Sequence, residues 1–519
     1  MGTAAETGEV RRGEIVAALS LATDLALGQP MEFAQQSCIL ANRIGRRIGA
    51  QRDQLAEIHH QSLLRYIGCN AETHAMAALF GDEIDFRRDF ARIDPGRASE
   101  MGALIFAYLR RANADAGAMA ALGAVVRGMI ASKAASVEIL SSHCEVAERL
   151  AERLGFPPSV RRNLGQLYER WDGKGLPRGL KGEAIAPAVR IVSFSQDEIV
   201  LRAAFGADGA KERIRARRGS AYEPQLVDLY LARAGELVAG LESVTWNEVQ
   251  ALSPDPDQPM SAAEFDEACL AIADFADLKS PWSVGHSRAV AALARDAAIR
   301  CGLPATDARD LYRAGLLHDI GQVAVPLRVW AKPAAFNDAD REQARMHPYF
   351  GERVLARPQS LARLANLVAQ HHERSDGSGY HQGLRGSALS APSRLLSAAE
   401  AYQNKIEARP HRAALSPSAA ADALKREARD GRLDPDAVAA VLAAAGHSVA
   451  PRRTLVADLT PREIEVLRAI ARGQSTKEIA RTLGVSPKTV DNQTQAIYAK
   501  LSVRTRGGAT LFAIEHGLC

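Results

Sequence analysis

A histidine and an aspartate are adjacent, His318-Asp319, after two leucines in the segment LLHDIG. Other histidines precede and follow this pair along the chain: His286, His347 and the neighbours His371 and His372. A neutral imidazole binds a metal ion through one ring nitrogen, and a carboxylate can bridge two ions with its two oxygens. Such ligands suit iron, manganese or zinc. These residue types therefore predict a metal centre in the second half of the chain.

The hexamer LLHDIG has a second copy, LLRYIG at residues 63–68, in which Arg65 and Tyr66 replace the His-Asp pair. Around the two hexamers, residues 37–49 align without a gap with residues 290–302. After an insertion of 49 residues in the first copy, the register is kept again, and nine positions of residues 167–184 are identical in residues 371–388. An internal repeat of this length has to be recognised before a fold is assigned. They indicate two copies of one domain.

Two segments are typical of linkers. Residues 252–259 are rich in proline and aspartate, and residues 446–454 contain glycine, proline and arginine. They divide the chain into residues 1–251, 260–445 and 455–519. Aromatic residues make up 5% of the chain, and apolar residues recur three and four positions apart, as at Val290, Ala294 and Ala297. The glycine-rich segments DGKGLPRG and DGSGY are expected to be loops. We therefore predict an all-α protein with two helical domains in tandem and a C-terminal four-helix domain.

The second copy resembles an HD-GYP domain over residues 264–445. The segments LLHDIG, HP, HHERSDGSGY and AAEAY follow one another in the order and spacing of that family. The family is helical and is associated with hydrolysis of cyclic di-GMP at a centre of two or three metal ions. The resemblance implies that the metal ligands are His286, His318, Asp319, His347, His371, His372 and Glu400. It also implies that Asp319 bridges the ions and that Tyr380 shapes the ligand pocket, which makes these two the candidate catalytic residues.

Four positions depart from the family pattern. Glu400 replaces an aspartate, Gln322 replaces the lysine that approaches the substrate phosphate, and His381 replaces the proline of the GYP motif. Trp282 occupies the position of a glutamate that three-metal members use. We therefore expect two divalent ions rather than three, with iron or manganese preferred over zinc. Without the lysine, the sequence leaves open whether the centre hydrolyses a phosphodiester.

The first copy keeps the loop scaffold of the family but has lost nearly all of the ligand residues. Only His347 has a histidine counterpart, His143; the other six positions carry Phe33, Arg65, Tyr66, Leu167, Tyr168 and Gln196. This copy is therefore expected to be free of metal. It could serve as a packing partner, or it could form a small-molecule pocket lined by Arg65, Tyr66 and His143, where an arginine suits an acidic ligand. The apolar insertion at about 90–140 would close that pocket or form a dimer interface.

The C-terminal segment is basic, whereas the rest of the chain is neutral. Residues 459–519 contain nine Lys or Arg against five Asp or Glu, which accounts for the whole net charge of +4. Capping residues predict helix starts at Thr460, Ser475 and Pro487. The segment resembles a LuxR-type helix-turn-helix, which implies that it binds double-stranded promoter DNA as a dimer. The candidate DNA-binding residues are Lys477, Lys488, Thr489, Asn492 and Gln493, because amide and basic side chains read base edges and phosphates.

No run of apolar residues is long enough for a membrane span, and the six cysteines show no CxxC spacing. We therefore expect a cytoplasmic protein without membrane contact. The leading interpretation is a homodimeric transcription regulator whose tandem body binds a metal centre and senses a small ligand. The alternative is a metal-dependent phosphodiesterase of a cyclic dinucleotide such as cyclic di-GMP, with a DNA-binding tail. A third interpretation makes the body a dimerisation scaffold alone.

Overall fold

The computed structural model describes residues 10–114, 118–253, 259–447, 459–471, 474–501, 503, 509 and 512–513. Within these ranges every regular element is a helix, which confirms the all-α prediction. None of the helices in the described ranges combines the length and apolarity needed to cross a membrane. The chain forms two compact units, residues 1–448 and residues 449–519. The predicted linkers fall largely outside the described residues.

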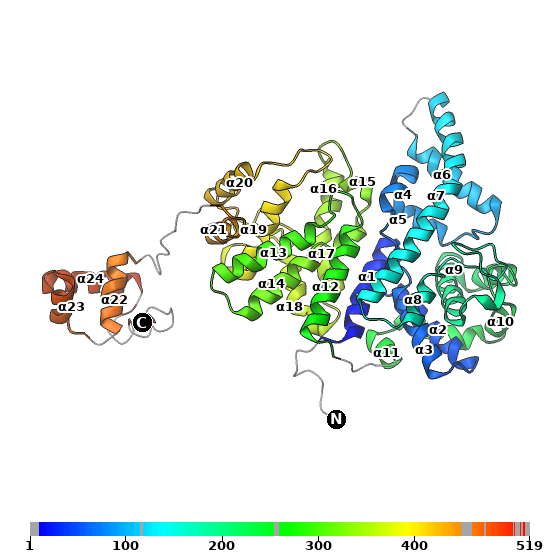
Figure 1. Cartoon of the computed structure of the whole chain (residues 1–519), viewed down its shortest axis with the longest axis horizontal. Helices are drawn as coiled ribbons and strands as arrows, with labels where there is room; N and C mark the ends of the chain where they lie inside the picture. Colours follow the sequence, from blue (N-terminus) through cyan, green and yellow to red (C-terminus); the bar gives the residue numbers. More distant parts are fainter. Residues whose placement is uncertain are drawn as a thin grey trace. The chain divides into compact units, whose positions relative to one another are not determined.

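The first copy, with its insertion, precedes the second copy within the larger unit (Figure 1). Its elements are α1 (Arg12–Ala26), α2 (Phe33–Arg47), α3 (Arg52–Leu64), α4 (Thr73–Phe80), α5 (Glu83–Phe90), α6 (Ala98–Ala112), α7 (Ala118–Arg153), α8 (Pro158–Leu164), η1 (Gly182–Ala184), α9 (Pro187–Ala216), α10 (Pro224–Val238), η2 (Leu241–Ser243) and α11 (Trp246–Ala251). The second copy comprises α12 (Ala262–Asp277), α13 (His286–Arg300), α14 (Ala305–Leu317), η3 (Ile320–Ala324), α15 (Leu327–Trp330), α16 (Asp338–Arg345), α17 (His347–Leu355), η4 (Gln359–Leu361), α18 (Ala362–Gln370), η5 (Gly386–Ala388), α19 (Ala391–Ile406), α20 (Pro417–Arg429) and α21 (Pro435–Ala444).

Buried polar contacts show that the two copies share one fold. Asp24 accepts a hydrogen bond from the backbone N–H of Ala34, and Asp277 accepts the equivalent bond from Ser287. Close backbone approaches are repeated as well. A Cβ atom at Gly68 would lie 1.9 Å from the carbonyl oxygen of His143, and one at Gly321 would lie 2.0 Å from that of His347. Only glycine fits such contacts, so the repeated LLxxIG hexamer has a structural cause that does not depend on metal.

The insertion of the first copy is helical and contains α6 and the first part of α7. Helices α6 and α7 pack against each other, and they extend side by side in Figure 1. A cluster of apolar side chains joins these two helices to α4 and α5: Met76, Phe80, Phe86, Ile105, Tyr108, Leu109 and Ile139. Phe80 and Phe86 stack with their ring centroids 4.0 Å apart. The insertion therefore packs on α4 and α5 through a shared apolar cluster.

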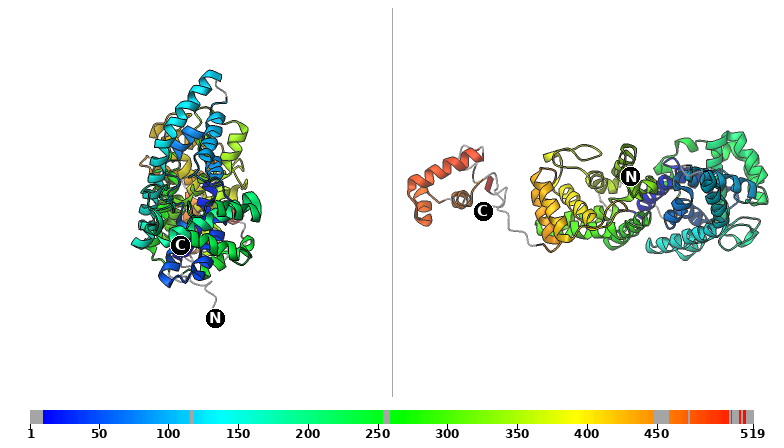
Figure 2. Two further views of the ribbon diagram at one scale, coloured as in Figure 1. Left: turned by 90° about the vertical axis from the view of Figure 1, so that its right-hand side faces the viewer. Right: turned by 90° about the horizontal axis from the view of Figure 1, so that it is seen from above.

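The two copies lie side by side (Figure 1 and Figure 2) and share a buried interface. Helix α1 of the first copy packs on η3 and α17 of the second. Glu83 on α5 forms an ion pair with Lys279, at 2.8 Å between the carboxylate and the ammonium, and both side chains are fully buried. The Asn70 amide donates to the carbonyl oxygen of Phe275 at 3.0 Å. Polar groups that are buried in pairs fix one arrangement of the two copies, because any other would leave them without partners.

The C-terminal unit contains α22 (Pro461–Ala471), α23 (Thr476–Leu483) and α24 (Pro487–Lys500). The three predicted helix starts are confirmed. Glu463 and Thr460 cap α22 reciprocally, Ser475 and Glu478 form a capping box on α23, and Ser486 caps α24. Val490, Ile497 and Leu501 are buried in the core of this unit. The fourth expected helix lies largely outside the described residues.

Candidate metal centre, cavity and DNA-binding helix

The seven residues that the resemblance implies as ligands converge from five helices of the second copy. His286 begins α13, His347 begins α17, and Glu400 lies within α19. His318-Asp319 follows the end of α14, and His371-His372 follows α18. Helix ends place the side chains at one point because α13, α14, α17, α18 and α19 pack against one another. Six of the side chains are buried, and His372 is partly exposed.

Asp319 lies between two groups of ligand atoms and faces each with a different oxygen. Its Oδ2 is 3.2 Å from His318 Nε2 and 3.6 Å from His286 Nε2. Glu400 completes this first group, with Oε2 2.9 Å from His286 Nε2. The other oxygen, Oδ1, is 3.4 Å from His347 Nε2 and 3.8 Å from His371 Nε2. His347, His371 and His372 form the second group. A carboxylate in this position has the geometry of a bridge between two cations.

Backbone carbonyls orient three of the histidines. The Nδ1 atoms of His318, His347 and His371 are hydrogen-bonded to carbonyl oxygens three residues earlier, at 2.8, 2.6 and 2.6 Å. A ring that donates from Nδ1 to a carbonyl presents the lone pair of Nε2 to the site. Nε2 is the atom that points toward Asp319 in each case. The local helix ends thus fix the tautomer that metal binding requires.

The electrostatics of the two groups differ. Burial lowers the pKa of His371 to about 3, with the positive charges of neighbouring imidazoles adding to the effect. Burial also lowers the pKa of His286, but the carboxylates of Glu400, Glu407 and Asp319 outweigh it and raise that pKa to about 10. Burial acts against the charged form of Asp319, yet the surrounding imidazoles hold its pKa well below the usual range. The carboxylates of the first group therefore attract positive charge, which a metal ion can supply.

Buried atoms without hydrogen bonds also indicate that these residues fit divalent cations. His318 Nε2 and Glu400 Oε2 are buried, and neither makes a hydrogen bond of normal geometry within the described residues. Buried polar atoms are almost always hydrogen-bonded. Imidazole nitrogens and carboxylate oxygens meet here at one buried point, and some of their lone pairs accept no hydrogen bond. This set of donor atoms matches the coordination of iron, manganese or zinc. The metal assignment of these residues stays a prediction that the geometry favours.

Glu407 is a residue of this site that sequence reasoning missed. Its Oε2 lies 2.8 Å from His286 Nδ1, and Arg409 holds the same oxygen at 2.9 Å. A carboxylate behind a ligating histidine orients the ring and raises its basicity. The available signal was spacing, because Glu407 follows Glu400 by seven residues and comes directly after the last residue of α19.

A cavity of about 390 Å³ opens beside the ligand residues. Tyr380 stacks on the His372 ring, with centroids 4.8 Å apart, and the Arg345 guanidinium lies 5.0 Å from the Tyr380 ring centroid. Gln322 and Trp282, two of the departures from the family pattern, also line this cavity. His381, the third departure, is bound to Glu352 at 3.0 Å and does not line the cavity. Arg345 therefore brings a cation to a site where the family lysine is missing.

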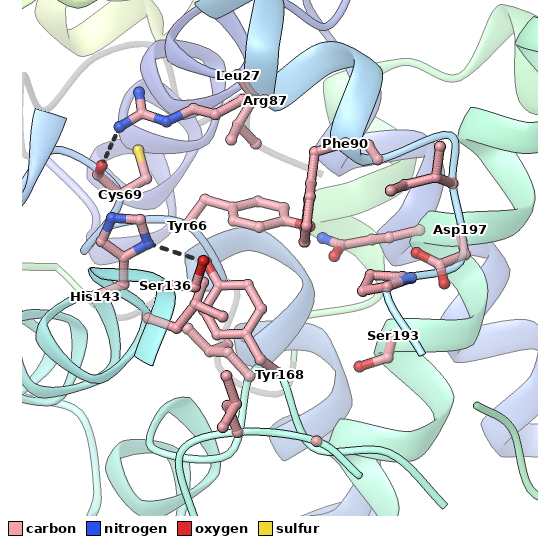
Figure 3. A pocket seen from close by; sticks show the side chains of 18 of the residues that line it. Leu27, Tyr66, Cys69, Arg87, Phe90, Ser136, His143, Tyr168, Ser193 and Asp197 are labelled. Carbon is pink, nitrogen blue, oxygen red and sulfur yellow. Dashed lines mark hydrogen bonds between the residues drawn. The ribbon is translucent and has the colours of Figure 1, made fainter. Parts of the chain in front are cut away.

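The first copy contains a cavity of about 280 Å³ at the corresponding position. All seven residues that replace the metal-ligand positions line it: Phe33, Arg65, Tyr66, His143, Leu167, Tyr168 and Gln196. Figure 3 shows Tyr66 and Tyr168 on its wall, with Tyr168 Oη bound to His143 Nδ1 at 3.1 Å. Residues of α4, α5, α6 and α7 complete the lining. That this cavity takes a ligand stays a prediction.

Helix α24 presents the predicted DNA-contact residues to solvent. Lys488, Thr489 and Asn492 are exposed, Gln493 is half-buried, and Lys477 is exposed on α23. The buried side of α24 packs on α22 and α23. An exposed second helix after a tight turn at Gly484, which has a φ of 66°, is the arrangement in which a helix-turn-helix enters the major groove. Contact of these five residues with DNA stays a prediction.

Comparison with known proteins identifies both parts of the chain. The model of the family described as HD domain matches residues 131–226 and 271–437, and that of the luxR family of bacterial regulatory proteins matches residues 457–513. The 3'3'-cGAMP-specific phosphodiesterase 3 of Vibrio cholerae is 26% identical over 434 residues, which cover 82% of this chain and 93% of that protein. A cyclic di-GMP phosphodiesterase of Pseudomonas aeruginosa is 35% identical over 163 residues, or 31% of this chain and 39% of that protein.

One solved structure has the same fold over most of the chain. The crystal structure of a cyclic GMP-AMP specific phosphodiesterase from V. cholerae superposes with a TM-score of 0.58 and 24% sequence identity. The match covers 84% of this chain and 98% of that one. It supports the tandem arrangement of helical domains in the body.

Proposed function

The chain belongs to the HD domain family, and on that premise we propose that its body is a metal-dependent phosphodiesterase of cyclic dinucleotides coupled to a promoter-binding module. A C-terminal LuxR-type domain accompanies the HD-type body. The observation that carries the proposal is the position of Asp319 between two complete groups of ligand atoms. The proposed domains are residues 1–251, 260–445 and 455–519, of which only the second holds metal.

The ligand residues would hold two divalent ions, iron or manganese in preference to zinc, with Asp319 as the shared ligand. When bound, such ions would lower the pKa of a bound water so that it can act as the nucleophile. They would also supply positive charge for the phosphate oxygens. The chain itself orients the ligands, because carbonyl oxygens and Glu407 hold the Nδ1 atoms of four histidines. Glu400 replaces the usual aspartate and still reaches His286, so this departure does not remove a ligand position.

Tyr380 and Arg345 form the part of the cavity wall that suits a nucleotide. The Tyr380 ring is held between His372 and the Arg345 guanidinium. The guanidinium has donors for phosphate oxygens, and its fork can bind two of them at once. We assign to Arg345 the phosphate contact that Gln322 no longer provides. The relatives named above act on 3'3'-cGAMP and on cyclic di-GMP, which supports a cyclic dinucleotide as the substrate class.

The C-terminal module would bind double-stranded DNA through α24. Lys488 and Asn492 are exposed on this helix, together with Thr489. Asn and Gln side chains read adenine edges, and Lys contacts guanine or phosphate. One module per chain favours a homodimer, since such modules bind paired half-sites. Transcription would then respond to the nucleotide that the body binds.

A second candidate function is a regulator that binds the nucleotide without cleaving it. The observation that favours it is Gln322, an uncharged residue on the cavity wall where the family has a lysine. In that case the metal centre would hold the ligand and its occupancy alone would be the signal.

Metal analysis of the purified protein, combined with turnover of 3'3'-cGAMP and cyclic di-GMP, separates these functions. The double variant His318→Ala with Asp319→Ala should lose bound metal and turnover while DNA affinity remains measurable. His411→Ala, an exposed histidine in the same copy, is the matched control. Full metal content in the double variant contradicts the site. Metal binding by the native protein without turnover of either nucleotide contradicts the enzyme and favours the regulator.

A further inference from the structure

Two buried arginines line the cavity of the first copy without a carboxylate partner. Arg65 donates to Ser193 Oγ at 2.8 Å and to the carbonyl oxygen of Leu167 at 2.9 Å. Arg87 donates to the carbonyl oxygens of Ala26 and Cys69, the latter contact being drawn in Figure 3. Each side chain is only 7% exposed, and the Nε atom of each is buried without a hydrogen bond. Within the described ranges, no carboxylate lies within 4.0 Å of either guanidinium.

The carboxylates on the cavity wall already have partners. Asp197 accepts a hydrogen bond from Tyr222 Oη at 2.6 Å and lies 3.7 Å from the Arg217 guanidinium. Glu169 accepts backbone hydrogen bonds from Arg178 and Leu180, both at 2.8 Å. Neither of these carboxylates forms an ion pair with Arg65 or Arg87. A buried cation without a counter-charge is costly, and an anion that enters the cavity removes that cost.

Two further polar atoms on the cavity wall have no partner. His143 Nε2 and Gln196 Oε1 are buried and make no hydrogen bond within the described part of the chain. Both occupy positions that hold metal ligands in the second copy, His347 and Glu400. The wall of the emptied site thus brings a cation, a ring nitrogen that can donate as N–H and a side-chain amide to one part of the cavity.

Another part of the lining is apolar and comes from α4, α5, α6 and α7. Its side chains include Met76 and Phe80 of α4, Phe86 and Phe90 of α5, Ile105 of α6 and Ile139 of α7. A cavity with an apolar chamber and a few convergent polar groups is typical of a small-molecule site. An apolar chamber of this kind excludes a ligand that is polar throughout, because its polar groups would lose hydrogen bonds to water without replacement.

We propose that the cavity of the first copy binds a small amphipathic carboxylic acid, with its carboxylate at Arg65 and its apolar body among the apolar side chains of α4, α5, α6 and α7. The volume of about 280 Å³ fits a medium-chain or single-ring acid. A cyclic dinucleotide carries two charged phosphates and would bring one of them into the apolar chamber, so this chamber does not suit it. The first copy therefore recognises a ligand of a different chemical class from the substrate of the second.

Helix α5 connects this cavity to the metal centre. Phe86, Arg87 and Phe90 line the cavity, while Glu83 on the same helix accepts hydrogen bonds from the backbone N–H of Leu327 at 3.0 and 3.2 Å. Lys279, the ion-pair partner of Glu83, donates to the carbonyl oxygen of Val323 at 3.0 Å. Val323 lies in η3, which begins directly after Asp319. A ligand that shifts α5 thus changes contacts of the segment that carries the bridging carboxylate, and this regulatory effect alone rests on the proposed function.

Calorimetric titration of the full chain with decanoate tests the site. We expect one decanoate per chain, and much weaker binding of decan-1-ol and decylammonium, which share the chain length but lack the anion. Arg65→Gln should weaken decanoate binding about tenfold to a hundredfold, as expected for the loss of a charge-assisted hydrogen bond. Lys174→Gln, an exposed cation at the cavity rim, is the matched control and should bind decanoate as the native protein does.

A cavity-filling variant keeps the test decisive if Arg65→Gln fails to fold. Ala91→Phe adds a ring at a position that lines the cavity on the end of α5 and should abolish decanoate binding. Equal affinity for decanoate, decan-1-ol and decylammonium would overturn the assignment of the ligand class. Undiminished decanoate binding in Ala91→Phe would overturn the site itself. Neither readout depends on turnover, so both stand apart from the proposed enzyme activity.

The regulatory part has its own variant. Decanoate should change the turnover of 3'3'-cGAMP by the native protein. The double variant Glu83→Gln with Lys279→Met removes the ion pair without leaving one buried charge alone. It should bind decanoate with native affinity but show no change in turnover. If decanoate still changes turnover in this variant, the coupling is overturned. It is also overturned if decanoate binds to an active native enzyme without changing its turnover.

Discussion

Glu373 and Glu169 lie 204 positions apart and support equivalent loops in the two copies. The Glu373 carboxylate accepts backbone hydrogen bonds from Gln382, Gly383 and Leu384 at 2.7 to 3.0 Å. Glu169 accepts those of Arg178 and Leu180. In the second copy the loop carries Tyr380 to the mouth of the metal centre, whereas in the first copy it borders the cavity of Arg65.

Replacement of Glu373 by alanine should therefore destabilise the fold and also impair the site. The loss of charged acceptors for buried N–H groups predicts a decrease of about 1.5–3 kcal/mol in the free energy of unfolding. Urea denaturation measures this value. Glu169→Ala should cost a similar amount of stability but leave metal content and turnover unchanged. Equal losses of activity in both variants would contradict the separation of the two sites.

Glu407 should tune metal affinity without being a ligand. Because its carboxylate orients His286 through Nδ1 at 2.8 Å, Glu407→Ala should weaken metal binding about tenfold to a hundredfold. Competition with a chelator of known affinity gives the change. Glu427, which pairs with Lys405 away from the ligand residues, provides the control variant Glu427→Ala. A Glu407→Ala protein that retains metal as firmly as the native one would show that the ring needs no such support.

Arg345 should contribute to substrate binding. Arg345→Gln removes the cation beside Tyr380, so kcat/KM for 3'3'-cGAMP is expected to fall about tenfold to a hundredfold, with metal content unchanged. Arg353→Gln, an exposed arginine on α17 that stacks on Tyr349, serves as the control. If the two variants have the same kcat/KM, the phosphate contact must come from another residue.

Lys488 should contribute to DNA affinity mainly through phosphate charge. Lys488→Ala is expected to weaken binding to all sequences and to reduce the slope of log affinity against log salt by about one. Asn492→Ala should instead relax base preference and leave the slope unchanged. Electrophoretic or anisotropy titrations at several salt concentrations distinguish these effects. An unchanged slope for Lys488→Ala would move the contact surface away from the start of α24.

Acid should destabilise the first copy through His59. Burial, with a contribution from His60, lowers the pKa of His59 to about 3, whereas an unfolded histidine titrates near 6.5. The unfolded state therefore binds the proton first as pH falls below about 6.5, and stability is lost by up to about 1.4 kcal/mol per pH unit until the folded pKa is reached. His59→Gln should flatten the pH dependence of urea denaturation between pH 7 and 5. His74→Gln, at an exposed position, should leave it as it is.

The resemblance to the HD-GYP family supplied the candidate ligand residues, and the structure brings all seven together at or near helix ends. His347-Pro348 starts α17, and His318 follows the apolar turn of α14. The repeat predicted that Arg65, Tyr66 and His143 share one cavity wall, and all three line the cavity. Arg87 and Phe86 on α5 also line it, but they replace no ligand position of the second copy, so the repeat did not predict them. The Glu83–Lys279 pair joins residues 196 positions apart, and no periodic pattern reports such a contact.

That buried pair also limits how this chain can be divided. Without the first copy, the Lys279 ammonium would lose Glu83, and the face of η3 and α17 that α1 covers would be exposed to water. A fragment that begins at residue 260 is therefore expected to misfold or aggregate, although the sequence repeat suggests two interchangeable modules. The helices of residues 459–501 have an apolar core of their own and can be exchanged between proteins. Recombination can thus exchange the LuxR-type module, whereas the two copies of the body must be kept together.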